Sequence, residues 1–192
     1  DPARDSLGGA ACHGQDAEQL KALLRRYADA AQGLFHALLP DYALTLQRER
    51  TSLRPAAIAG RVTSWRKDDT LLHVDSFPSS PVQGRRILRL FCNVNPRGEA
   101  RTWRIGEPFP NVANRFWERL PPANWLKREF LAWFRVTRGT RSEYDHYMLH
   151  LHDAMKADAE YQRDVEQVRF DFPAGSAWAC FTDQVSHPAM AG

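Results

Sequence analysis

Residues 84–106, with the sequence GRRILRLFCNVNPRGEARTWRIG, carry the strongest strand signals in the chain and decide its fold class. In the first half, Ile87, Arg89 and Phe91 share one face of an expected strand, and the residues between them share the other face. The NPRG that follows is rich in turn-forming residues, and EARTWRIG alternates again. We therefore predict that residues 85–106 form a β-hairpin.

The rest of the chain alternates between helix and strand patterns. Apolar residues at helical spacing predict a helix within residues 14–40, opened by a capping box of Asp16 and Gln19 and closed by Pro40. Further helices are predicted over 111–119, over 124–134 and from Ser142 onward, and further strands at DTLLHVDSF (69–77), VRFDF (168–172) and SAWACFTD (176–183). Short strands with helices between them favour an α+β fold, a double-stranded β-helix (jelly roll, cupin-like) with helices packed outside.

Composition and charge limit the class of protein. The chain has 192 residues, 43% of them hydrophobic, which suits a single domain over residues 1–192 with the helix of residues 14–40 as an N-terminal packing element. The formal net charge of +3 is too small to indicate a nucleic-acid partner, but it suits an anionic substrate or an anionic membrane surface.

Cysteine usage and the lack of targeting signals bear on the compartment. Cys12, Cys92 and Cys180 are widely spaced and form no C-x-x-C motif, so we expect free thiols and a reducing, cytoplasmic environment. The sequence has no apolar run of about 20 residues. Its first residues lack the basic start and long apolar centre of a signal peptide.

The stretch TLLHVDSFPSSP, residues 70–81, places His73 and Asp75 on the same face of an expected strand. An imidazole and a carboxylate placed in this way can bind one metal ion. With a second histidine they form the 2-His-1-carboxylate set of non-haem Fe(II) oxygenases, which leaves positions open for a 2-oxo acid and O₂. Chance gives about 0.5 such pairs in a chain of this composition, so for the pair alone a simple His–Asp hydrogen bond at a sheet edge is the favoured interpretation.

A third ligand would have to come from a distant histidine. His187 follows the predicted strand at residues 176–183, where a jelly roll could return it to the same sheet. The alternative is a solvated loop histidine.

Several arginines are candidates for binding an anion. Arg89 lies among apolar residues, where an unpaired charge is expensive. Arg101 and Trp103 share a face of the next predicted strand, so the three could line one pocket in which guanidinium groups hold a carboxylate. Arg54 is a further candidate. The alternatives are a protein carboxylate as the partner of Arg89 and an ordinary surface position for Arg54.

Longer segments resemble a known family. The segments TSLRP, GRVTSWRKDDTLLHVDSFPSSPVQGRRILRLFCNVNP, RTWRIGEPF, YDHYMLHLHDAMKAD and WACFTDQVSHPAMAG are similar to the Kdo hydroxylases. These are Fe(II)/2-oxoglutarate-dependent dioxygenases that act on the 3-deoxy-D-manno-oct-2-ulosonic acid (Kdo) of Gram-negative lipopolysaccharide. The resemblance covers most of residues 40–192.

The resemblance implies an activity, a site and partners. His73, Asp75 and His187 would be the iron ligands, and the contacts to co-substrate or substrate would be Arg54, Arg89, Arg101 and Trp103. The reaction would place a hydroxyl group on C3 of Kdo while O₂ is consumed and 2-oxoglutarate becomes succinate and CO₂. A Kdo-containing glycolipid or acidic sugar would be the substrate, and a lipid-linked one implies peripheral contact with the cytoplasmic face of the inner membrane. The family extends further at both ends, so we expect the domain to lack sequence there.

Two other functions stay open at this point. His146 and His150 are four residues apart on the helix that begins at Ser142, which is a spacing that can bind zinc in a hydrolase. A cupin-like module that binds a ligand without catalysis is the second alternative.

Overall fold

The structure is a computed structural model that describes residues 6–54, 64–123 and 141–191. The contacts divide the chain into two compact units, residues 1–56 and 57–192. In the first unit, helix α1 spans Gly14–Leu38 and a short 3-10 helix, η1, spans Pro40–Tyr42, which confirms the predicted helix and its end.

The predicted start of α1 is wrong in detail. His13 is the N-cap residue and makes no side-chain capping bond. Asp16 therefore lies inside the first turn rather than before it, where its negative charge favours the helix dipole instead of capping a backbone N–H. The box of Asp16 and Gln19 does not form because the N-cap lies three residues earlier, at His13, than the sequence pattern indicates.

The longest described helix of the second unit is α4, which spans Glu143–Ala157. Ser142 caps α4 as predicted: its side chain accepts a hydrogen bond from Asp145 N–H, and the Asp145 carboxylate accepts one from Ser142 N–H. The predicted helix over 124–134 lies outside the described residues. The remaining helical elements are η2 (Trp65–Lys67), α2 (Phe109–Phe116), η3 (Trp117–Arg119) and α5 (Ala159–Asp164).

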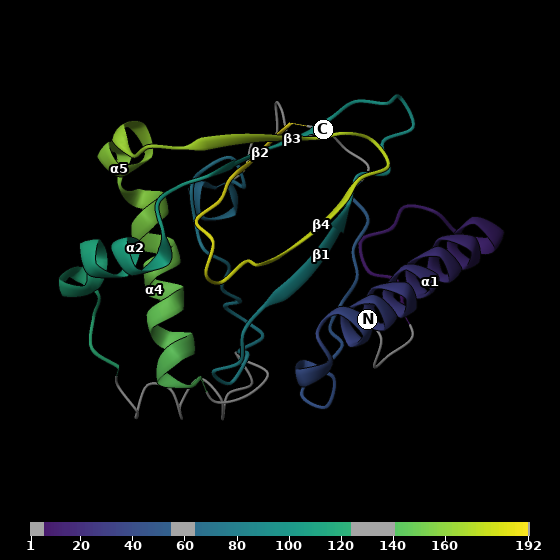
Figure 1. The fold of residues 1–192 in the computed structure, drawn as a ribbon, viewed down its shortest axis with the longest axis horizontal. Helices are drawn as coiled ribbons and strands as arrows, with labels where there is room; N and C mark the ends of the chain where they lie inside the picture. Colours follow the sequence, from purple (N-terminus) through teal and green to yellow (C-terminus); the bar gives the residue numbers. More distant parts are fainter. Residues whose placement is uncertain (1–5, 55–63, 124–140, 192) are drawn as a thin grey trace. The chain divides into compact units, whose positions relative to one another are not determined.

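Among the described residues, five strands form two antiparallel sheets (Figure 1). One sheet pairs β1 (Leu88–Cys92) with β4 (Ala177–Phe181). In the other, β2 (Arg101–Ile105) lies between β3 (Val168–Phe172) and β5 (Ala189–Ala191). The strands predicted at VRFDF and SAWACFTD are confirmed as β3 and β4.

The predicted hairpin over residues 85–106 is wrong, because β1 and β2 belong to different sheets. The connection between them is anchored elsewhere by the buried Asn93, whose side-chain amide donates to the carbonyls of Glu99 and Phe172. The backbone of Asn93 pairs with Ser176 and Gly175 in the turn before β4. Alternation gives the correct faces of each strand but not its partner.

The two sheets meet through an aromatic cluster. Trp103 of β2 and Ala189 of β5 are buried in it, packed against partly buried residues from both sheets, namely Phe91, Phe172, Trp178 and Cys180. Trp178 lies opposite Phe91 in the β1–β4 pair and stacks on Phe172 of β3, with ring centroids 3.9 Å apart. Rings from both sheets therefore interdigitate between them.

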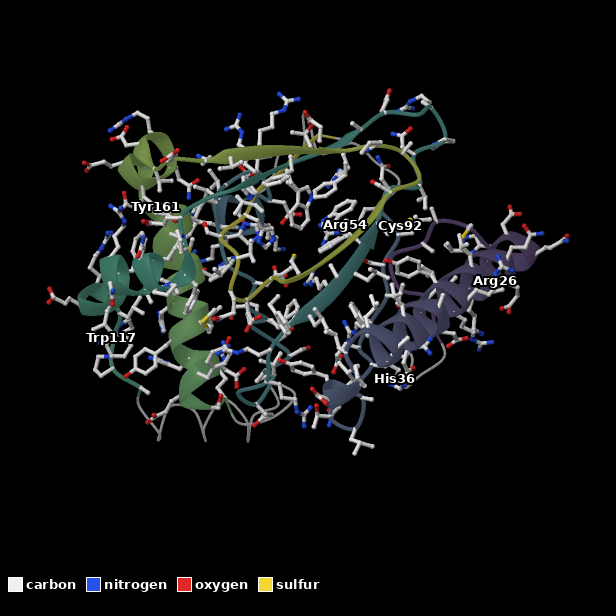
Figure 2. The ribbon with its side chains drawn as sticks, viewed as in Figure 1. Arg26, His36, Arg54, Cys92, Trp117 and Tyr161 are labelled. Carbon is white, nitrogen blue, oxygen red and sulfur yellow. The ribbon has the colours of Figure 1, made fainter. Side chains whose placement is uncertain are left out.

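All three cysteines are free, as predicted. Cys92 lies at the end of β1 (Figure 2), and Cys180 lies on β4. Burial raises the pKa of the Cys180 thiol to about 11, so this thiol is protonated at neutral pH.

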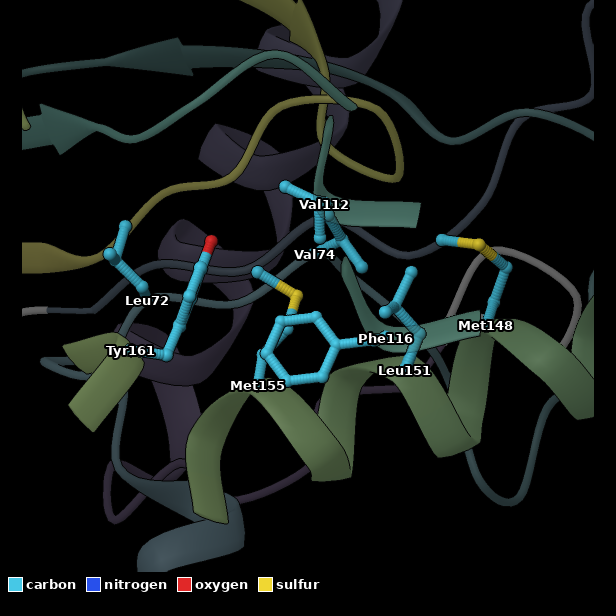
Figure 3. Close-up of a cluster of buried hydrophobic side chains, with 8 residues drawn as sticks. All are labelled: Leu72, Val74, Val112, Phe116, Met148, Leu151, Met155 and Tyr161. Atoms are coloured by element: carbon cyan, nitrogen blue, oxygen red, sulfur yellow. The ribbon is translucent and has the colours of Figure 1, made fainter. Parts of the chain in front are cut away.

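A second core packs α4 against residues 72–74 (Figure 3). Leu72 and Val74 point into it, and the other buried members come from three helices, namely Val112, Phe116, Met148, Leu151, Met155 and Tyr161. Residues 69–77 form no regular strand: residues 69–71 lie in a turn and a bend, and His73 makes one isolated bridge, to His187. Because side chains alternate along an extended chain, burying Leu72 and Val74 in this core turns His73 and Asp75 to the other side.

Among the described helices, none has the length and apolar content needed to cross a bilayer.

Candidate metal centre

Backbone pairing brings together the three side chains that the sequence singled out. His73 N–H donates to the His187 carbonyl (3.2 Å) and His187 N–H donates to the His73 carbonyl (2.9 Å). Asp75 N–H donates to the carbonyl of Thr182 (2.9 Å). As a result, one ligand atom from each of His73, Asp75 and His187 lies within 4.8 Å of the others, and residues 6–54, 64–123 and 141–191 contain no second group of this kind.

Both imidazoles are oriented by a carbonyl two residues earlier in their own segment. Nδ1 of His73 is 2.7 Å from the Leu71 carbonyl oxygen, and Nδ1 of His187 is 2.7 Å from the Val185 carbonyl oxygen. A carbonyl can only accept a hydrogen bond, so each Nδ1 carries the proton. Each Nε2 then has a free lone pair, which is the tautomer that metal-binding histidines adopt.

The charge states of the three groups also suit a cation. Burial, followed by the proximity of His187 and Lys156, holds the pKa of His73 well below its usual range, and burial likewise lowers the pKa of His187. Burial acts to raise the pKa of Asp75, but the neighbouring Arg89 guanidinium and His187 outweigh it, so the pKa is lowered. At neutral pH the site therefore offers two neutral imidazoles and one carboxylate.

One buried atom indicates that a cation belongs here. Oδ2 of Asp75 is buried and makes no hydrogen bond to any described residue, although Nε of Arg89 approaches it to 3.1 Å as an ion pair. A buried carboxylate oxygen without a hydrogen bond is costly. Oδ1 lies 3.9 Å from His73 Nε2. A divalent metal ion bound by these atoms would satisfy the carboxylate, and the donor set is that of non-haem iron sites.

The four residues predicted to bind an anion differ from one another in their surroundings. Arg89 pairs with Asp75, so the alternative of a protein carboxylate as its partner is what the structure shows. Trp103 is buried, with its ring stacked on His187 at 4.8 Å between centroids and 9° between planes. Arg101 lies on the same face of β2 as Trp103 and is half-buried. Arg54 belongs to the first unit, and its role stays a prediction.

Sequence reasoning did not identify the residues of α4 beside the site. The ring of His152 meets the ring of His73 edge-on, with centroids 5.5 Å apart and planes at 82°. Nδ1 of His152 is 2.9 Å from Oδ1 of Asp153, whose other oxygen accepts from Arg66 (2.9 Å). Lys156, one turn further along, is buried and donates to the Arg66 carbonyl. The helical spacing of His152 and Lys156 was visible in the sequence, but the segment that they face was not.

The surroundings of His146 and His150, the pair considered for zinc, differ from those of the three-residue centre. His146 and His150 lie with ring centroids 4.5 Å apart, but a ring nitrogen of His146 is bonded to the Pro121 carbonyl. No third ligand joins the pair in the part of the chain that the structure describes.

Comparisons with known proteins identify the family of this chain. The family profile of 3-deoxy-D-manno-oct-2-ulosonic acid (Kdo) hydroxylase matches residues 1–192. The crystal structure of the Kdo hydroxylase KdoO with α-ketoglutarate and Fe(III) is 53% identical, has a TM-score of 0.95, and is matched over 100% of this chain and 65% of that chain. The cobalt(II) complex of KdoO gives the same values, and its apo structure gives a TM-score of 0.94 at the same identity and coverage.

The chain thus spans 65% of the length of these solved relatives, which are described as non-heme Fe(II) α-ketoglutarate-dependent dioxygenases. A comparison with curated proteins finds no match. The profile match over all 192 residues, together with the solved relatives at 53% identity, means that this chain belongs to the Kdo hydroxylase family.

Proposed function

We propose that the protein is an Fe(II)/2-oxoglutarate-dependent dioxygenase that hydroxylates C3 of Kdo in a lipopolysaccharide precursor. The observation that carries this proposal is the convergence of His73, Asp75 and His187 within 4.8 Å. The similarity to KdoO, which has been solved with α-ketoglutarate, succinate and Fe(III), supports the choice of metal and co-substrate.

The roles of the chain's own residues follow from their geometry. Nε2 of His73, Nε2 of His187 and a carboxylate oxygen of Asp75 would hold the iron, leaving three positions for co-substrate and O₂. Bound iron supplies the redox chemistry by which 2-oxoglutarate becomes succinate and CO₂ and the sugar gains a hydroxyl group. The Trp103 ring, stacked on His187, keeps water from one side of the ligand set.

Anion recognition is assigned to the arginines. Arg89 and Arg101 lie on the faces of the two sheets that carry the aromatic cluster, beside Trp103. Guanidinium groups bind carboxylates through paired hydrogen bonds, so we assign these residues, with Arg54, to the carboxylates of 2-oxoglutarate and of the acidic sugar. Nε of Arg89 faces Asp75, and in this proposal the rest of the guanidinium group would serve the ligand.

The finer architecture and the location belong to the same proposal. Two sheets that meet through an aromatic core fit a double-stranded β-helix in one dioxygenase domain. A lipid-linked Kdo acceptor would require peripheral contact with the cytoplasmic face of the inner membrane.

The test uses the full-length protein. Anaerobic Fe(II) plus 2-oxoglutarate should give a metal-to-ligand absorption band in the parent and in His150→Ala, and none in His187→Ala. In air, succinate formation should rise when Kdo-containing lipid is added. A parent that binds both ligands but forms no succinate with any Kdo acceptor would refute the activity and indicate a binding module instead.

A further inference from the structure

The side-chain amide of Gln162, on α5, bonds to the backbone of Leu72 in the way that a neighbouring β-strand would. Its Oε1 accepts a hydrogen bond from Leu72 N–H (2.8 Å), and its Nε2 donates to the Leu72 carbonyl (2.9 Å). Nε2 also donates to the Met155 carbonyl near the end of α4 (2.8 Å). One amide thus pairs both backbone groups of Leu72 and ties them to a helix.

These bonds act on the two peptide planes that precede His73. The first plane carries Leu72 N–H, which Gln162 holds, and the Leu71 carbonyl on the opposite side, which accepts from Nδ1 of His73. The second plane carries the Leu72 carbonyl, which Gln162 also holds, and His73 N–H, which donates to His187. A peptide unit is rigid and planar, so fixing one side of each plane fixes the other side.

Helix α5, which carries Gln162, is held in place by its N-terminal cap and by the core. α5 begins at the Asp158 cap, whose carboxylate accepts from Tyr161 N–H (2.9 Å). Tyr161 is buried in the core beside Leu72 and Met155. Gln162, the next residue, is therefore held on the opposite edge of residues 71–73 from the one that pairs with His187.

We infer that Gln162 is a positioning residue that sets the orientation of the His73 imidazole, and through it the metal affinity of the site. This role rests on the proposed function only in that His73 is a metal ligand. Gln162 itself is not one of the three candidate ligands. Losing its amide would leave Leu72 N–H and two carbonyls unpaired in a buried region, and the two planes would be free to rotate.

The experiment compares variants by cobalt(II) binding in the full-length protein, well below each variant's unfolding temperature. Gln162→Met is close in shape and lacks all three hydrogen bonds. Gln162→Asn keeps the amide but is one methylene too short to reach Leu72. The matched control is Leu151→Ala, which opens a cavity in the same core without touching these hydrogen bonds. His73→Ala defines the signal of a lost ligand.

We expect both Gln162 variants to weaken cobalt(II) binding by about 10- to 100-fold and to change its visible spectrum. Leu151→Ala should lower the melting temperature at least as far and leave the Kd for cobalt(II) near that of the parent. An unchanged Kd and spectrum in Gln162→Met would overturn the inference, as would equal weakening in Leu151→Ala or a parent that binds no cobalt(II). A parent that binds cobalt(II) but forms no succinate would refute the proposed activity alone.

Discussion

Replacing Trp103 by leucine should weaken both the fold and the metal centre. A buried Trp side chain removes about 150–250 Å² from water, and leucine recovers roughly half of that area, so the lost burial costs about 2–3 kcal/mol at about 25 cal/mol per Å². The lost stack on His187 adds about 0.5–1.5 kcal/mol. A total of about 2.5–4.5 kcal/mol should lower Tm by roughly 5–18 °C in a chain of this size.

Trp178→Leu is the matched control for Trp103→Leu. Trp178 stacks on Phe91 and Phe172 and meets Trp103 edge-on at 5.6 Å between centroids, whereas the ring that stacks on His187 is that of Trp103. Thermal melting of the metal-free protein and titration with cobalt(II) should separate the two variants. Both should lose stability, and only Trp103→Leu should raise the Kd for the metal, by about tenfold. Equal Kd values for the two variants would mean that the stack on His187 does not orient the ligand.

Three more outcomes are expected. Acidification from about pH 7 to pH 5 should lower the stability of the metal-free protein in urea unfolding. Folding lowers the pKa values of His73 and His187 from 6.5, so in this range the unfolded chain binds protons that the folded chain does not. A stability that stays constant from pH 7 to pH 5 would contradict this reasoning. Met155 is 0% exposed, so Met155→Ala should lower the free energy of unfolding in urea by about 2–5 kcal/mol. A loss below about 1 kcal/mol would mean that the core closes over the gap. His146→Ala and His150→Ala should retain the metal content of the parent, and metal loss in either would support the zinc alternative.

Local patterns in the sequence predicted the elements better than their partners. The spacing of apolar residues located α1, α4, β3 and β4, because the burial of one face depends only on nearby residues. The hairpin failed because the partner of β1 is β4, far along the chain, and the buried Asn93 that redirects the connection looks like an ordinary turn residue.

For the candidate site, too, local spacing predicted what lies close in the sequence and not what comes from far along the chain. The i, i+2 spacing of His73 and Asp75 placed both on one face, whereas spacing alone could not select His187 over the other histidines. The resemblance to a family supplied that choice. Gln162 carried no signal, since its role arises only when α5 lies against the backbone of Leu72.

The antiparallel bridge between His73 and His187 joins two segments that are remote in sequence by one pair of backbone hydrogen bonds, and single bonds from Asp75 N–H to Thr182 and from Ala189 N–H to Asp69 flank it. An ion shared by their rings would act as a removable cross-link, closing a long loop in the native chain but not in the denatured one. Ligands that bind only the native state stabilise it by mass action, by about 2.7 kcal/mol at a hundredfold excess over Kd. If the site holds iron as proposed, the supply of iron would thereby influence how long each molecule survives proteolysis.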